Sequence, residues 1–64
     1  MHHLHRNAIQ FAKTYLLALD RGVDTTDAAE ALDRTIKTLA AQVNRHTKEV
    51  RSEILGAAIA RLRN

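Results

Sequence analysis

Residues 20–27 read DRGVDTTD and carry the clearest signals for the end of one helix and the start of another. Gly22 can adopt the left-handed conformation that often closes a helix. Asp24 is suited to cap the following helix, and Asp27 follows three residues later, as in a capping box. The stretch therefore predicts a helical hairpin with its turn at residues 22–24.

On the N-terminal side of this turn, the sequence predicts a helix over residues 4–21. Apolar residues recur there at steps of three and four, which is the pattern of a helix with one buried face. That face comprises Leu4, Ala8, Phe11, Ala12, Tyr15, Leu16 and Leu19. The aromatic pair on it is expected to pack in the core rather than to stack on nucleic-acid bases.

On the C-terminal side, a second helix is expected over residues 25–63, because no proline or loop cluster interrupts it. A narrow apolar seam of coiled-coil type runs along it. The seam consists of Leu32, Ile36, Leu39, Val43, Val50 and Ile54. Such a helix would be about 60 Å long, against about 25 Å for the first helix.

This difference in length predicts a partner, since the first helix can cover only the first half of the seam. A homodimer in a four-helix or crossed-hairpin bundle is the economical way to bury the rest. The expected oligomer interface comprises Val43, His46, Val50, Ile54, Leu55, Ile59 and Leu62.

A break in the second helix is the alternative. Asn44 could close one helix and Thr47 could cap another, so that a third helix folds back. The absence of glycine from that stretch favours the continuous helix. A bend near Gly56 is also possible, because Leu55, Ile59 and Leu62 lie on a different side from the seam.

Length and composition exclude several classes of function. The chain has 64 residues, 45% of them hydrophobic, no cysteine and no proline, and a formal net charge of +3. We expect one all-α domain over residues 1–64, without disulfides or a thiolate zinc site. No catalytic motif is present, so we expect neither an enzyme nor a cofactor nor a small-molecule substrate. No apolar run approaches the length of a membrane span, and a cytoplasmic protein is expected.

Charge is segregated along the chain. Five acids lie within residues 20–33, and five bases lie within residues 34–51. On a continuous helix the bases share one side, opposite the seam, where they could bind nucleic acid or an acidic protein surface. These bases are Arg34, Lys37, Arg45, Lys48 and Arg51.

The predicted function is therefore that of a small oligomeric regulator that binds nucleic acid. The alternative is a protein-interaction adaptor, inhibitor or assembly subunit that uses the exposed second half of the long helix. Met1, His2 and His3 have the spacing of an amino-terminal Cu(II) or Ni(II) site, but this spacing is common by chance and no metal is assigned.

Overall fold

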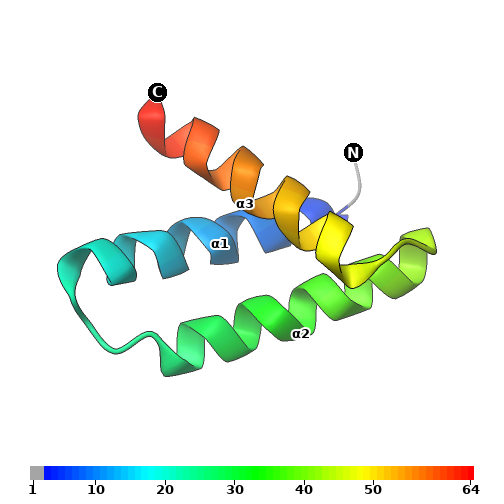
Figure 1. Ribbon diagram of the computed structural model, residues 1–64, viewed down its shortest axis with the longest axis horizontal. Helices are drawn as coiled ribbons and strands as arrows, with labels where there is room; N and C mark the ends of the chain where they lie inside the picture. The colour runs from blue at the N-terminus through cyan, green and yellow to red at the C-terminus, as the bar shows by residue number, and fades with distance from the viewer. Residues whose placement is uncertain (1–2) are drawn as a thin grey trace.

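A computed structural model describes residues 3–64, which fold into three α-helices and no strand (Figure 1). The helices are α1 (His3–Arg21), α2 (Thr26–Val43) and α3 (Thr47–Arg63). The all-α prediction is confirmed, and α1 begins one residue before the predicted range of 4–21 and ends at the same residue. The two-helix hairpin is wrong, because the expected second helix is divided into two helices of 18 and 17 residues.

The first turn follows the prediction at Gly22. This residue has a φ of 72°, in the left-handed region that favours glycine. The Gly22 N–H donates to the Leu19 carbonyl at 3.1 Å, and the Val23 N–H donates to the Ala18 carbonyl at 3.1 Å. This pair of bonds is the Schellman motif, which satisfies carbonyls at the end of α1.

Asp24 was predicted to cap the second helix, but it lies one residue before the N-cap of α2, which is Thr25 and makes no side-chain capping bond. Asp24 instead bonds to Thr26, the first residue of the helix. The Asp24 Oδ1 accepts hydrogen bonds from the Thr26 N–H at 3.0 Å and from the Thr26 hydroxyl at 2.7 Å. The side-chain bond and then the backbone bond lower the pKa of Asp24, because both favour the ionised carboxylate. The Thr25 carbonyl accepts from the Ala29 N–H at 2.8 Å and so begins the helix.

The second turn explains why the prediction of one continuous helix over residues 25–63 was wrong. Asn44 adopts the left-handed conformation, with φ 55° and ψ 50°. Its N–H donates to the Ala41 carbonyl at 3.3 Å, and the Arg45 N–H donates to the Ala40 carbonyl at 3.0 Å. The bonding is that of the first turn, with asparagine in the place of glycine, which asparagine tolerates better than most residues.

After this turn α3 begins at Thr47, and the extended residue His46 precedes it as the N-cap. The His46 carbonyl accepts from the Val50 N–H at 3.1 Å. Thr47 is thus the first residue of the helix rather than its cap, which corrects that part of the alternative.

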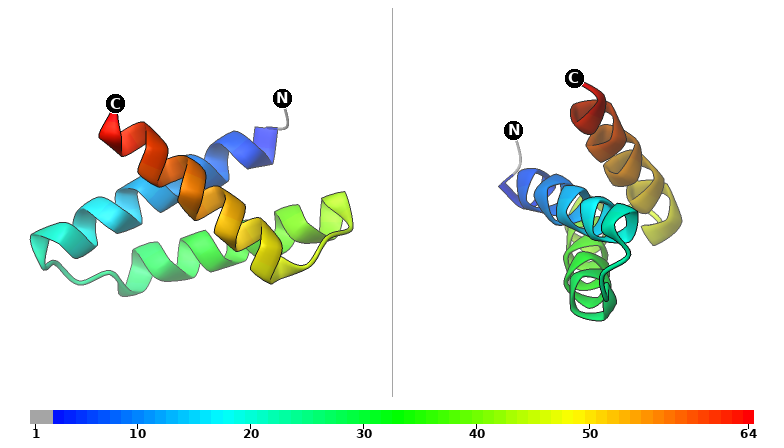
Figure 2. Two further views of the ribbon diagram at one scale, coloured as in Figure 1. Left: turned by 45° about the horizontal axis from the view of Figure 1, so that its top comes forward. Right: turned by 90° about the vertical axis from the view of Figure 1, so that its left-hand side faces the viewer.

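Helix α1 is the centre of the bundle and packs against both other helices. Figures 1 and 2 show α2 running back beside α1, while α3 crosses α1 obliquely on another side. The buried core draws on all three helices and consists of Ala8, Ile9, Ala12, Leu32, Ile36, Leu39, Ala40, Val50, Ile54 and Ala58. The seam is therefore covered within the chain, except for Val43, which is 41% exposed.

Because two helices pack on α1, its buried face differs from the prediction. Ile9 was not expected in the core, yet it is only 1% exposed. Tyr15 packs against the core as predicted, whereas Phe11 is 41% exposed and was wrongly placed there. The buried face of α1 therefore includes Ile9 and leaves Phe11 exposed.

Candidate interaction surfaces

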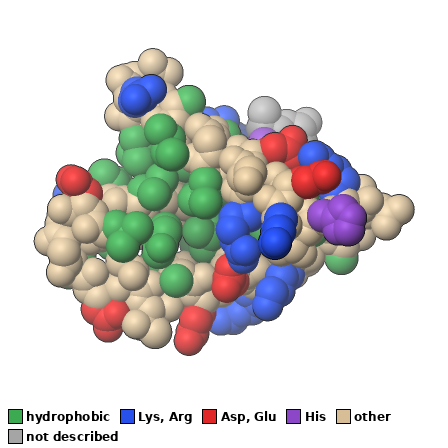
Figure 3. All heavy atoms as spheres, in the orientation of Figure 1, with side chains coloured by type: hydrophobic (Ala, Val, Ile, Leu, Met, Phe, Trp, Pro, Cys, Tyr) green, Lys and Arg blue, Asp and Glu red, His purple; other side chains and the backbone are tan. Residues whose placement is uncertain are grey.

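The five predicted cations do not form one stripe, because the second turn separates them. Arg34 and Lys37 lie on α2, Arg45 lies in the turn, and Lys48 and Arg51 lie on α3. Figure 3 shows Lys and Arg side chains gathered on one face together with Asp and Glu side chains. The uninterrupted basic face that the continuous helix implied is therefore absent among residues 3–64.

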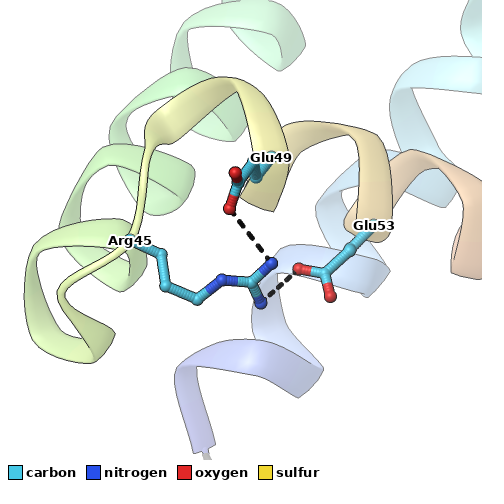
Figure 4. Close-up of polar contacts among 3 residues, drawn as sticks. All are labelled: Arg45, Glu49 and Glu53. Carbon is cyan, nitrogen blue, oxygen red and sulfur yellow. Dashed lines mark hydrogen bonds and ion pairs between the residues drawn. The ribbon is translucent and has the colours of Figure 1, made fainter.

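Arg45 is engaged by two carboxylates of α3, as Figure 4 shows. Its Nη1 lies 2.5 Å from Oε2 of Glu53, and its Nη2 lies 3.4 Å from Oε2 of Glu49. These acids, Glu53 before Glu49, raise the pKa of Arg45 above its ordinary value. The ion pairs tie the second turn to the first two turns of α3 and occupy the guanidinium that was predicted to bind a ligand.

Arg51 is also engaged, since it forms an ion pair with Asp33 that joins α3 to α2. Arg34, Lys37 and Lys48 have no carboxylate within ion-pair distance among residues 3–64. These three remain as the cations most able to meet an external anion.

The residues of the predicted oligomer interface also do not stay together, because some are buried in the core and others are exposed. Val50 and Ile54 are buried inside the chain and are not available to a partner in this fold. Val43 and His46 are exposed beside the second turn. The remaining three predicted residues, Leu55, Ile59 and Leu62, lie farther along α3.

Exposed apolar side chains gather over α1 and α3, as Figure 3 shows. Ile59 and Leu62 of α3 are 45% and 39% exposed, and Leu19 of α1 is 50% exposed. Leu16 and Leu55 are half-buried and pack against the core. We call these five residues the apolar surface.

A cavity of about 330 Å³ lies by the second turn. Its lining is mostly apolar and comprises His5, Leu39, Val43, Arg45, Val50, Glu53 and Ile54. The Nδ1 atom of His5 is buried there without a hydrogen-bond partner in the part of the chain that the structure describes. Sequence reasoning missed His5, although its position three and four residues before Ala8 and Ile9 places it on the apolar face of the helix.

Neither metal binding nor membrane insertion finds support in the described residues. Residues 3–64 contain no group of three or more His, Cys, Asp or Glu side chains that could hold a metal ion. Met1 and His2, and the side chain of His3, lie outside the described part, and with them the amino-terminal metal motif. None of the three helices is long and apolar enough to cross a membrane.

Comparisons of the chain with protein-family models, with curated proteins and with solved structures found no match.

Proposed function

We propose that this chain is a non-enzymatic protein-interaction module that binds its partner through the apolar surface. The observation that carries the proposal is the exposure of Leu19, Ile59 and Leu62, each between 39% and 50%. Figure 3 shows hydrophobic side chains gathered on one face over α1 and α3, the two helices that carry these residues. Contiguous exposed apolar surface is a feature of protein interfaces, because association removes it from water.

The arrangement of α3 explains why this surface is left open. Its buried residues are Val50, Ile54 and Ala58, which follow one another at four-residue steps and form a single narrow stripe. Ile59 and Leu62 lie to one side of that stripe and at the end of the helix, where nothing in residues 3–64 covers them fully. A partner that packs beside α3 would bury them.

The polar groups give weaker support to nucleic acid as the main ligand. Two of the five predicted cations, Arg45 and Arg51, are held by carboxylates of the same chain. A phosphate backbone would have to displace Glu53 or Asp33 to reach them, which reduces the gain from counterion release.

The proposal is tested with tagged chain isolated gently from its host and examined by native mass spectrometry. We expect the wild-type chain to carry added mass beyond its own 7.2 kDa. The variant I59E/L62E should lose it, because two carboxylates would be desolvated in the interface. The matched control is Leu17→Glu, which changes a leucine of α1 that is 44% exposed and lies outside the apolar surface. Wild-type chain recovered alone would refute the proposal.

Nucleic-acid binding is a second candidate, favoured by the three of the five predicted cations that lack an ion-pair partner in residues 3–64. Arg34, Lys37 and Lys48 are exposed and lie on two adjoining helices. The variant R34Q/K37Q/K48Q should bind labelled nucleic acid more weakly and show a shallower dependence on salt. An unchanged salt dependence in this variant would dispose of the second candidate.

A further inference from the structure

We infer that the partner on the apolar surface is a second copy of this chain, related to the first by a two-fold axis. The inference rests on the proposed function and adds the identity and the orientation of the partner. It is carried by the charges that border the apolar surface.

One edge of the apolar surface is mainly acidic, with Arg21 as the single cation within residues 20–30. Asp20 lies in the last turn of α1, and Asp24, Asp27 and Glu30 lie at or near the start of α2. All four are exposed. Figure 3 shows Asp and Glu side chains along this side of the hydrophobic gathering, over the end of α1 and the start of α2.

The opposite edge is basic. The last turn of α3 carries Arg61 and Arg63, both exposed. In Figure 3 a basic side chain lies at this end of α3, on the other side of the hydrophobic gathering from the acidic edge. Further Lys and Arg side chains border the gathering near the start of α3.

A surface with one acidic and one basic edge is complementary to itself under a two-fold rotation. When the axis lies in the plane of the apolar surface, at right angles to the line from the acidic to the basic edge, the acidic edge of each copy faces the basic edge of the other. Both contacts form at once, and the leucines and isoleucine of the two copies meet between them. A partner of uniformly acidic or uniformly basic surface would instead be repelled at one edge.

The size of the chain favours the same partner. A domain of 64 residues buries a modest share of its surface, and association between copies is a common way to supplement so small a core. A second copy brings the same five apolar residues to the interface, so the hydrophobic area covered on each side is equal.

Two charge-reversed variants test the arrangement. D20K/E30K reverses the acidic edge and raises the net charge by four, from +3 to +7, and R61E/R63E reverses the basic edge and lowers it by four, to −1. Asp24 is left unchanged because it accepts two hydrogen bonds from Thr26 at the start of α2. Sedimentation equilibrium of the wild type should give twice the 7.2 kDa mass, and each variant alone should dimerise at least about tenfold more weakly.

Mixing the two variants should restore dimerisation, as a heterodimer in which both edges are again complementary. The variant R6E/K13E has the same net charge of −1 but alters two cations of α1 that belong to neither charged edge. A mixture of D20K/E30K with R6E/K13E should therefore not gain the same affinity. Equal heterodimer formation with both partners would overturn the inference, because net charge alone would then explain it.

The experiments distinguish failure of the proposed dimer from failure of the proposed interaction function. Circular dichroism first establishes that I59E/L62E and the charge-reversed variants retain helicity. If the wild type is a monomer but binds a different protein through Ile59 and Leu62, the second copy is refuted and the interaction module stands. If the wild type binds neither itself nor another protein, both are refuted.

Discussion

The two turns of this chain reach the same geometry with different residues. Gly22 closes α1 and Asn44 closes α2, each in the left-handed conformation and each within the same pair of backbone hydrogen bonds. The bond from the residue after the cap is 3.1 Å at the first turn and 3.0 Å at the second. A Schellman motif built on asparagine thus ends a helix here as a glycine motif does.

The turns differ in how the next helix begins. Neither N-cap, Thr25 of α2 or His46 of α3, makes a side-chain capping bond. Asp24, one residue before the N-cap of α2, accepts two hydrogen bonds from Thr26, and Arg45, at the same place before α3, forms ion pairs instead. These ion pairs tie the second turn to α3. We infer that local hydrogen bonding specifies the first turn, and that the packing of α3 on α1 specifies much of the second.

The largest effect is expected from removing that packing. Ile54 is fully buried, and Ile54→Ala should lower the free energy of unfolding by about 2–5 kcal/mol, since a cavity remains where the side chain was. Chemical denaturation followed by circular dichroism measures the change. If local signals alone held the second turn, hydrogen exchange in α3 would be unchanged by this substitution.

The control for this variant is Ile59→Ala on the same helix. Ile59 is 45% exposed, so its truncation removes less buried area and should cost well under half as much. Equal losses from the two variants would contradict the placement of Ile54 in the core and Ile59 at the surface.

The contrast between the turns shows which helix ends could be predicted from the sequence and which could not. Gly22, with an acid two residues later, was sufficient to predict the end of the first helix and the start of the second. Asn44 carried a similar signal, but an asparagine is also compatible with a helix, and its effect depends on whether a third helix can pack. Ile9 is buried in the core that all three helices form, although it lies outside the apolar face that the sequence predicts for the first helix.

The predicted oligomer interface agrees with the structure only in part, because it too was drawn on a continuous second helix. Ile59 and Leu62 were expected at an interface because their side of the helix differs from the seam, and they are exposed in the structure. Val50 and Ile54 were expected there only because the helix was taken as continuous, and the break places both in the core. Whether Ile59 and Leu62 bind a partner stays a prediction.

A smaller effect is expected from alanine at either turn. Gly22→Ala should lower the free energy of unfolding by about 1 kcal/mol, because alanine is strained in the left-handed region. Asn44→Ala should lower it by less, because asparagine is already an L-residue there and only tolerates the region better than alanine does. A Cβ at Gly22 would meet no atom within 4 Å, so its cost comes from the backbone alone. Thermal and chemical denaturation measure both variants against the wild type.

Asn44→Gly is the matched control for the second turn. Glycine adopts the left-handed conformation without strain, so this variant should be as stable as the wild type or more stable by about 0.5 kcal/mol. A stable Asn44→Ala chain of increased helicity and length would instead mean that α2 and α3 can fuse into the long helix that the apolar seam predicts.

The smallest expected effect is on the pH dependence of stability, to which Asp24 at the first turn contributes. The pKa of Asp24 is lowered below its ordinary value of 3.8 by its bonds from Thr26, so its contribution to stability is present above that value. It is lost as the pH falls through the lowered pKa, because the protonated carboxyl accepts these bonds poorly. Asp24→Asn should therefore reduce the loss of stability between about pH 5 and pH 2, measured as melting temperature against pH. Thr47→Ala, at the start of α3, is the control and should leave the acid dependence of the wild type unchanged, since no ionisable side chain caps that helix.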